Sequence, residues 1–308
     1  MNNKKIAFLT YAEPNTGLGH WFRTLALEQE AKNQGYSTHF LTNRMLHREM
    51  YFQVRENNFD DIYNALHQIK PYAIVIDFQG NVPDYTYDIT RKFGIKTVIL
   101  NGVGRVEENN ANLVVIQGLS ETRNPNTVSG AKYVILRSKM GEISAKHNGN
   151  SWFVWGGARD RMGLLKMFNR VDDREATLVV HQEFIDPLIY RGITETHPNP
   201  LHLVTHVTGD AMLPIMANAK TACIAMGMAA WELAYLGTPT YAFSSTPGHL
   251  RFAKEMEIAG LLLAYPKVGL PNTVKQFCDF INQPITVQDE NRPDLLGAQR
   301  VMNLIGKL

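Results

Sequence analysis

The sequence predicts an α/β fold made of two domains, each built on a parallel β-sheet. Short runs of β-branched and other apolar residues alternate with segments of helical periodicity along the chain. This rhythm is typical of parallel sheets covered by helices on both faces. The chain has 308 residues, which corresponds to about two domains at roughly 100–200 residues each. We therefore expect two facing nucleotide-binding-type domains with a ligand cleft between them.

In the first half of the chain, apolar runs of four to six residues separate longer segments with helical spacing. Strands are expected at residues 6–10, 37–42, 73–77, 97–100 and 113–116. Helices are expected at residues 21–34, 48–56, 59–69 and 83–93. A polar, turn-rich stretch at residues 144–151 then indicates a domain junction.

The second half repeats the same rhythm without any detectable sequence repeat. Strands are expected at residues 152–155, 176–181, 201–207, 221–225 and 240–243. Helices are expected at residues 161–168, 210–217, 229–236 and 289–308. The predicted domains are residues 1–146 and 147–288, followed by the C-terminal helix over residues 289–308.

Charge and cysteine content exclude several classes of protein. The chain carries 31 Lys and Arg against 29 Asp and Glu, a net charge of +2, which does not indicate a general binder of polyanions. Cys223 and Cys278 lie far apart and neither belongs to a CxxC pair, so neither a zinc ribbon nor a disulfide framework is indicated. No signal peptide or bilayer-spanning apolar run is apparent. We expect a cytoplasmic protein.

The strongest local feature is the loop Gly17-Leu18-Gly19-His20, between the first predicted strand and the first predicted helix. Ligands of open α/β sheets gather at the carboxyl ends of strands, where this loop belongs. The glycines allow the backbone to approach a ligand closely, and His20 is a candidate general base. A glycine turn with a helix-capping histidine is an equally good interpretation, because the loop matches neither a complete GxGxxG nor a P-loop.

Two further glycine turns follow predicted strands of the second half. Gly156 and Gly157 could bring backbone amides toward a phosphate, and Arg159 could add charge. The alternative, an ordinary tight turn, is favoured for this segment by itself. Residues 226–229 form the other turn, and Glu232 after it could accept both hydroxyls of a ribose. A solvated glutamate in the first turn of a helix is nearly as good an explanation.

Taken in order, five elements resemble the two-domain nucleotide-sugar enzymes of the GT-B fold. The nearest branch is the UDP-sugar hydrolase of pseudaminic acid biosynthesis with its glycosyltransferase-like relatives. The matching elements are the GxGH loop with Arg23, the strand ending in Asp77, the Gly-x-x-Tyr-x-x-Leu-Arg segment at residues 130–137, the Gly156-Gly157 turn with Asp160, and residues 216–239 with Glu232. In such proteins a C-terminal helix often crosses back to the first domain.

The resemblance implies two Rossmann-like domains that bind different parts of the substrates. The C-terminal domain would bind the nucleotide and phosphates through Gly156, Gly157, Arg159, Val207, Met226, Gly227, Met228, Ala229, Glu232, Thr246, Gly248 and His249. In the N-terminal domain His20 would be the base, and the sugar or acceptor would contact Gly17, Leu18, Gly19, Arg23, Asp77, Asn101 and Arg105. Neither a metal ion nor a resident cofactor is expected, and the UDP-sugar is a co-substrate.

Two segments depart from the pattern of the family. The family's Asn-Gln pair after the last nucleotide-binding strand is missing, and residues 244–249 read Ser-Ser-Thr-Pro-Gly-His instead. Residues 101–105 read Asn-Gly-Val-Gly-Arg where the hydrolase branch tends to carry acidic residues. Both departures lie where the donor sugar and the acceptor are handled, so they weaken the hydrolase assignment more than the assignment of fold and nucleotide.

The resulting expectation is a metal-independent glycosyltransferase that moves a sugar from a UDP-sugar to an acceptor hydroxyl. The alternatives are a UDP-sugar hydrolase that uses water, and a non-catalytic nucleotide-sugar-binding protein. The acceptor is unknown. A small molecule or glycan is favoured over a modified nucleic-acid base, because no recognised nucleic-acid-binding motif accompanies the basic residues of the first half.

Overall fold

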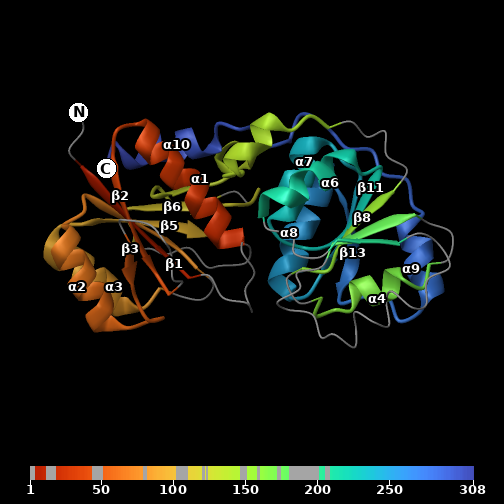
Figure 1. Cartoon of the computed structure of the whole chain (residues 1–308), viewed down its shortest axis with the longest axis horizontal. Helices are drawn as coiled ribbons and strands as arrows, with labels where there is room; N and C mark the ends of the chain where they lie inside the picture. The colour runs from red at the N-terminus through yellow and green to blue at the C-terminus, as the bar shows by residue number, and fades with distance from the viewer. Residues whose placement is uncertain are drawn as a thin grey trace. The chain divides into compact units, whose positions relative to one another are not determined.

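The computed structural model describes residues 4–11, 19–43, 51–78, 82–101, 110–119, 122, 124–145, 151–157, 160–171, 175–179, 201–204 and 209–308, with only the backbone for 101, 201–204 and 209. Internal contacts divide the chain into two compact units (Figure 1). Unit 1 comprises Met1–Ser138 together with Asp294–Leu308, and unit 2 comprises Lys139–Pro293.

Unit 1 is built on a parallel sheet with the strand order β3-β2-β1-β4-β5-β6-β7. The strands are β1 (Lys5–Thr10), β2 (Ser37–Thr42), β3 (Tyr51–Gln53), β4 (Ala73–Asp77), β5 (Lys96–Asn101), β6 (Leu113–Ile116) and β7 (Thr127–Val128). The central strands are buried on both faces because helices cover each side, which explains their nearly continuous apolar sequences.

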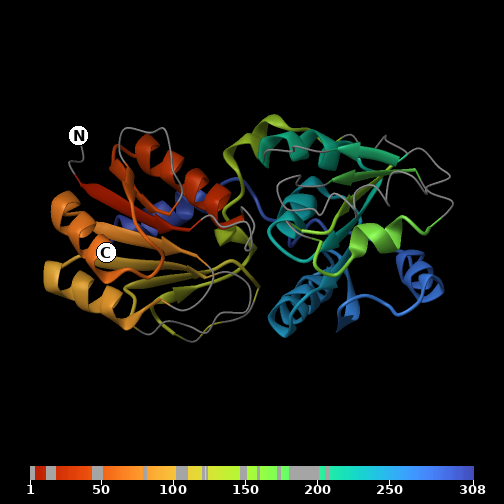
Figure 2. The same ribbon diagram turned by 60° about the horizontal axis from the view of Figure 1, so that its bottom comes forward.

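Two layers of helices cover the sheet of unit 1 on opposite faces, as Figure 2 shows. The helices are α1 (Gly19–Asn33), α2 (Phe59–Ile69), α3 (Asp84–Phe93) and α10 (Gly297–Ile305). The side chains of α1 and α10 pack with Ile6 and Phe8 on one face. Those of α2 and α3 pack with Ala7 and Leu9 on the other. The alternation along β1 therefore assigns each side chain of the strand to one of two separate cores.

The C-terminal helix α10 belongs to unit 1 and packs closely against residues 131–135, which include the 3-10 helix Ala131–Tyr133. A Cβ on Gly297 would lie 1.9 Å from the carbonyl oxygen of Val134, so only glycine allows this approach. Arg300 donates to both oxygens of Asp294 at 2.6 Å and to the carbonyl of Lys132 at 2.8 Å. The helix is shorter than the predicted residues 289–308.

Unit 2 is built on a second parallel sheet, with the order β10-β9-β8-β11-β12-β13. The strands are β8 (Trp152–Trp155), β9 (Ala176–Val179), β10 (Leu201–Val204), β11 (Thr221–Ala225), β12 (Thr240–Ser244) and β13 (Leu263–Val268). The helices are α4 (Leu164–Phe168), α6 (Met212–Asn218), α7 (Ala229–Leu236), α8 (Pro247–Ile258) and α9 (Val274–Ile281).

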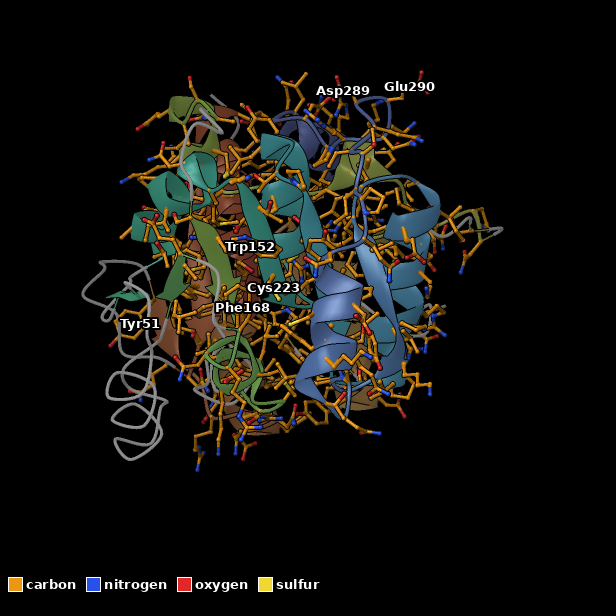
Figure 3. The ribbon with its side chains drawn as sticks, turned by 90° about the vertical axis from the view of Figure 1, so that its right-hand side faces the viewer. Tyr51, Trp152, Phe168, Cys223, Asp289 and Glu290 are labelled. Carbon is orange, nitrogen blue, oxygen red and sulfur yellow. The ribbon has the colours of Figure 1, made fainter. Side chains whose placement is uncertain are left out.

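An aromatic core holds α4 and α9 against the sheet of unit 2. Phe168 and Cys223 are fully buried there, and Trp152 packs against them (Figure 3). The ring of Phe243 stacks on that of Phe277 with the centroids 5.3 Å apart. Large rings supply much of the apolar area that this core buries.

Several predicted elements are confirmed to the residue, including those at residues 59–69, 73–77, 113–116, 152–155, 221–225 and 229–236. The helix predicted over residues 48–56 is wrong for its described part. Tyr51–Gln53 is instead an edge strand, with Tyr51 in register with Phe40 of β2. The helix predicted from residue 161 begins at Leu164, because Gly163 before it is left-handed with φ of 72°. The ends of the strands predicted to residues 181 and 207 lie outside the described residues.

Candidate functional site

The carboxyl ends of β1 and β4 form the topological switch point of unit 1. The chain leaves β1 toward β2 and β3 on one side, whereas β4 to β7 lie on the other side. Open α/β sheets bind ligands outside the strand ends at such a point. The last residues of the two strands, Thr10 and Asp77, are in register, and the helix that follows β1 along the chain is α1. His20, at the start of α1, therefore lies at the edge where the fold class predicts a site.

Strand alternation and helical periodicity together bring four polar side chains to this edge. Ala73 and Val75 face the core beneath α1, so Asp77, two residues further along β4, faces α1 as well. His20 lies in the first turn of α1, and Arg23 and Thr24 follow at the i+3 and i+4 positions, on the same side of the helix. The fully buried Asp77 thus meets one face of α1.

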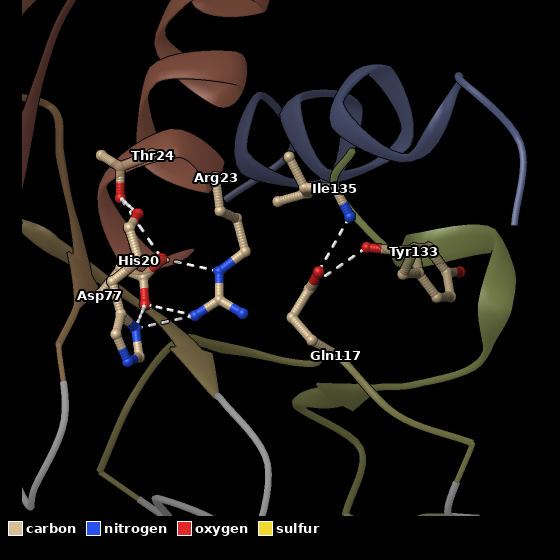
Figure 4. A network of polar contacts seen from close by, with 7 residues as sticks. All are labelled: His20, Arg23, Thr24, Asp77, Gln117, Tyr133 and Ile135. Carbon is tan, nitrogen blue, oxygen red and sulfur yellow. Dashed lines mark hydrogen bonds and ion pairs between the residues drawn. The ribbon is translucent and has the colours of Figure 1, made fainter. Parts of the chain in front are cut away.

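The four side chains form a continuous network (Figure 4). His20 Nδ1 lies 2.6 Å from Asp77 Oδ1. Arg23 donates from Nε to Asp77 Oδ2 at 2.7 Å and from Nη2 to Asp77 Oδ1 at 2.5 Å. The Thr24 hydroxyl is 2.8 Å from the carbonyl oxygen of His20 and 3.3 Å from Asp77 Oδ2. One carboxylate therefore organises the whole first turn of α1.

Asp77 carries a negative charge although it has no solvent contact. Burial by itself raises the pKa of a carboxyl group. Here the Arg23 guanidinium, the charge that His20 carries when it is protonated and the hydrogen bonds from both residues outweigh burial, so the pKa of Asp77 is lowered from 3.8 to about 2. The carboxylate is consequently an acceptor at every physiological pH.

This charge decides which nitrogen of His20 holds the ring proton. An ionised carboxylate can only accept hydrogen bonds, so His20 Nδ1 donates its proton to Asp77 Oδ1 across the 2.6 Å contact. Nε2 of the neutral ring then keeps a lone pair. The His20 side chain is 19% exposed, whereas that of Asp77 is 0% exposed. A histidine oriented by a buried carboxylate, with its other nitrogen unprotonated, can accept a proton from a substrate.

The remaining N-terminal candidates are placed less fully. Gly19 is the first residue of α1, and Asn101 is the last residue of β5, of which only the backbone is described. Gly17, Leu18 and Arg105 lie outside the described residues. Arg23 and Asp77, predicted as separate sugar or acceptor contacts, bind each other. Thr24 is a member of the network that was not predicted, although its i+4 spacing from His20 could have indicated it.

The Gly-x-x-Tyr-x-x-Leu-Arg segment is tied to the end of β6 by one buried amide. Gln117, 1% exposed, accepts a hydrogen bond from the Ile135 backbone at 2.8 Å and donates to the carbonyl of Tyr133 at 3.0 Å (Figure 4). The Arg137 guanidinium lies 4.8 Å from the ring centroid of Phe22, in the first turns of α1. This segment therefore supports the helix that carries His20.

The switch point of unit 2 lies between β8 and β11. Trp155 and Ile224 are in register, so the turns that follow them lie side by side. Gly157 has φ of 80°, and a Cβ placed on it would lie 3.7 Å from the Cβ of Ala225. Met226, Gly227 and Met228 continue the neighbouring turn, and α7 begins at Ala229. A Cβ on Gly227 would meet nothing within 4 Å.

Asp160 explains why residue 156 is glycine. Its carboxylate accepts hydrogen bonds from the amides of Leu164 at 2.7 Å and Leu165 at 3.1 Å. A Cβ on Gly156 would lie 2.1 Å from Asp160 Oδ1, so the carboxylate fills the space of the missing side chain. Burial raises the pKa of Asp160 to about 7, against the opposite effect of the amides of Leu164, Leu165 and Lys166. The glycine at residue 156, four residues before Asp160, therefore has a structural cause of its own.

Four further C-terminal candidates lie in the helices that follow β11 and β12 or at their starts. Glu232 is in the first turn of α7 and is 3% exposed. Thr246 caps α8 by accepting a hydrogen bond from the His249 amide at 3.1 Å, and Gly248 lies in the first turn between them. His249 Nδ1 is 3.0 Å from the Ser245 hydroxyl, and burial lowers the pKa of His249. Arg159 and Val207 lie outside the described residues.

Comparisons with known proteins point to a fold. No protein-family model matches the chain, and no curated protein matches it in sequence. Among solved structures it is similar to MurG of Acinetobacter baumannii, with 16% identity over 99% of this chain and 100% of that chain and a TM-score of 0.66. The chain has the GT-B fold.

Two other structures of this fold were solved with nucleotides. The UDP-GlcNAc 2-epimerase of Methanocaldococcus jannaschii, in complex with UDP-GlcNAc and UDP, is 10% identical over 99% of this chain and 100% of that chain, with a TM-score of 0.65. MnaA of S. aureus, in complex with UDP, is 11% identical over 99% and 96% of the chains, with a TM-score of 0.71. In the described part of this chain, no helix is long and apolar enough to cross a membrane, and no group of three or more potential metal-ligating His, Cys, Asp or Glu residues occurs.

Proposed function

We propose that this chain is an enzyme acting on a UDP-sugar, and specifically a glycosyltransferase with His20 as its general base. The observation that carries the proposal is the pairing of His20 Nδ1 with the buried, ionised Asp77, which leaves Nε2 as a proton acceptor. A general base contributes roughly 10²–10⁴-fold to such reactions.

In the proposed reaction, His20 Nε2 removes the proton from an acceptor hydroxyl. The acceptor oxygen then forms a bond to the anomeric carbon, and the bond from that carbon to the diphosphate oxygen breaks. The electron pair leaves with UDP, and His20 becomes an imidazolium whose charge Asp77 stabilises across the 2.6 Å contact. Arg23 and Thr24 hold the carboxylate in place.

We assign nucleotide binding to unit 2. The turns at Gly156-Gly157 and Met226–Met228 lie side by side at a switch point, and backbone amides in such turns and at helix N-termini bind diphosphates. The UDP bound by MnaA and by the epimerase supports this assignment through the shared fold. Amide donors and helix dipoles would stabilise the departing diphosphate, so the proposal assigns no role to a metal ion.

A sugar epimerase is a second candidate, because a UDP-GlcNAc 2-epimerase shares the fold over nearly the whole chain. Hydrolysis of the UDP-sugar remains a third, since the same base can activate water. The favoured acceptor of the transferase is a small molecule or a glycan, and a modified nucleic-acid base is the less favoured alternative.

Two measurements test the proposal. The melting temperature should rise with UDP and not with GDP, CMP or NAD; a ligand at 100 times its dissociation constant stabilises by about 2.7 kcal/mol. UDP-sugars are then incubated without acceptor and analysed by chromatography for free sugar and for the C2 epimer. A transferase leaves the donor intact until an acceptor is added, whereas rapid stoichiometric release of free sugar indicates the hydrolase and a new epimer indicates the epimerase. Binding without turnover over a broad donor and acceptor panel would leave a nucleotide-sugar-binding protein.

A further inference from the structure

Arg23 lies where a substrate-binding arginine is difficult to accommodate. It is 3% exposed, and it directs Nε and Nη2 at the two oxygens of Asp77, at 2.7 and 2.5 Å. Its Nη2 also lies 3.1 Å from His20 Nδ1. Because Nδ1 carries the ring proton, this contact brings two N–H groups together and contributes no hydrogen bond of its own.

The charges of the network balance in only one protonation state. With a neutral His20, one cation, Arg23, faces one anion, Asp77. When His20 gains a proton, two cations share the single carboxylate, and like charges at this distance repel each other strongly in a buried site. Among the described residues, removal of Arg23 would leave the Asp77 carboxylate with His20 as its one ionisable partner, and the balanced state would then be the protonated histidine.

The surrounding elements add no other charge to this balance in the described part of the chain. Among the described residues, Arg23 acts on Asp77 through its charge, and His20 does so when it is protonated. The neighbouring strand β1 ends in the buried, uncharged Thr10. On α1 the buried Glu28 is paired with Lys32 and accepts a hydrogen bond from Thr38.

On the α10 side, Arg300 is paired with Asp294. At the far amino end of β1, Lys5 donates to the carbonyl of Ile69. Neither group is part of the network that holds Asp77.

We propose that Arg23 is a positioning residue that keeps His20 unprotonated, by occupying the Asp77 carboxylate and by repelling a protonated ring. The inference rests on the proposed role of His20 as base, and it deepens that role. Arg23 would lower the affinity of His20 for a second proton. A larger fraction of the histidine would then be available as a base at neutral pH.

The test is a pH titration of the full-length protein labelled with ¹⁵N-histidine and followed by NMR, with His20→Gln identifying the His20 signals. In Arg23→Met, His20 should hold its second proton to a pH at least about one unit higher than in the wild type. Arg23→Lys keeps the positive charge and should lie closer to the wild type. A titration of Arg23→Met at the wild-type pH, or an equal displacement in Arg23→Lys, overturns the inference.

A second pair of variants tests the charge of residue 23 in the absence of the Asp77 carboxylate. Asp77→Asn is compared with the double variant Arg23→Met/Asp77→Asn. The two proteins differ only at residue 23, where one has a cation and the other a neutral side chain. His20 should lose its proton at a lower pH in Asp77→Asn, because the arginine then repels it without a carboxylate between them; equal titrations would contradict the proposal.

Kinetics separate this inference from the proposed function. The acid limb of kcat/KM should move to higher pH in Arg23→Met, with activity recovering as the pH rises, whereas a purely structural role would lower activity equally at every pH. If the NMR titration moves but the wild type turns over no UDP-sugar, the inference about Arg23 stands and the proposed function fails.

Discussion

The switch points of the two sheets solve different chemical problems with different parts of the chain. In unit 1 the edge is built from side chains, since His20, Arg23 and Thr24 converge on Asp77. In unit 2 the corresponding edge is built from backbone, with glycines at residues 156, 157 and 227. Two carboxylates described there are shielded from water: Asp160 accepts hydrogen bonds from the amides of Leu164 and Leu165, and Glu232 of α7 is 3% exposed.

The two edges therefore meet the requirements of two different kinds of site. A proton acceptor must be one titratable atom held in one orientation, which requires a side chain and a partner that fixes it. An anion site requires several amide donors at close approach, which requires the absence of side chains. Substitutions should therefore affect chemistry at the first edge, and packing or nucleotide affinity at the second.

The largest effect is expected from His20→Gln. Loss of the proton acceptor should lower kcat by roughly 10²–10⁴-fold while the affinity for UDP stays at the wild-type value. Steady-state kinetics and calorimetry with UDP provide the two measurements. His67→Gln is the matched control, because His67 lies exposed at the end of α2 and contacts only the rings of Tyr63 and Phe93 among the interactions described. An equal fall of kcat in the control and in His20→Gln would contradict the role of His20 as the proton acceptor.

Asp77→Asn should be the most destabilising change at the first edge. It leaves the buried Arg23 without its anion, and breaking a buried ion pair costs about 3–5 kcal/mol. Urea unfolding monitored by circular dichroism measures this loss. A free energy of unfolding within about 1 kcal/mol of the wild type would show that contacts other than the Asp77 charge hold Arg23.

The same carboxylate predicts how stability depends on acid. The pKa of Asp77 is about 2 in the folded protein against an ordinary value of 3.8. The pairing therefore contributes fully above about pH 4, and about 2 kcal/mol is lost as the pH falls through the folded pKa. Asp77→Asn should lose that part of the acid dependence, which urea titrations at several pH values can measure.

Two glycine substitutions at the second edge separate an effect on stability from an effect on UDP binding. Gly156→Ala places a methyl group on the Asp160 carboxylate, so we expect a loss of about 1–3 kcal/mol in stability, typical of overpacking. Gly227→Ala meets nothing within 4 Å and should preserve the melting temperature while weakening UDP binding. Unchanged UDP affinity in Gly227→Ala would argue against that turn as part of the nucleotide site.

The smallest effect is expected from Thr246→Ala. The hydroxyl caps α8 through the His249 amide at 3.1 Å, and removal of such a cap costs about 1 kcal/mol. Thr246→Ser keeps the oxygen and should remain near the wild type. Thermal unfolding of the two variants measures the difference, and equal losses would indicate that the methyl group of Thr246 matters more than the cap.

Most elements could be predicted from periodicity because they are long or strongly apolar, as α2 and β4 illustrate. The failure at residues 48–56 has a physical reason. Tyr51–Gln53 is only three residues long and becomes a strand through pairing with β2, so its conformation depends on a partner that is distant in sequence. The delayed start of α4 depends likewise on the Asp160 turn and on Gly163, whose positive φ helical spacing does not reveal.

The candidate base could be found from the GxGH loop, but its partner could not. His20 and Asp77 are 57 residues apart in the chain, and nothing in either local pattern distinguishes a carboxylate that binds histidine from one that binds a sugar. The register of β1 with β4 and the face of α1 decide the pairing.

The sequence by itself determined two parallel sheets, their glycine-rich turns and the histidine at the start of α1, because each is written in local periodicity and residue type. Only the tertiary structure decided that Arg23 serves Asp77, that Asp160 fills the space beside Gly156, and that residues 294–308 pack on the first unit. These relations depend on distances between segments far apart in the chain. Because a buried carboxylate has no water to stabilise its charge, the groups at these distances decide whether it is ionised.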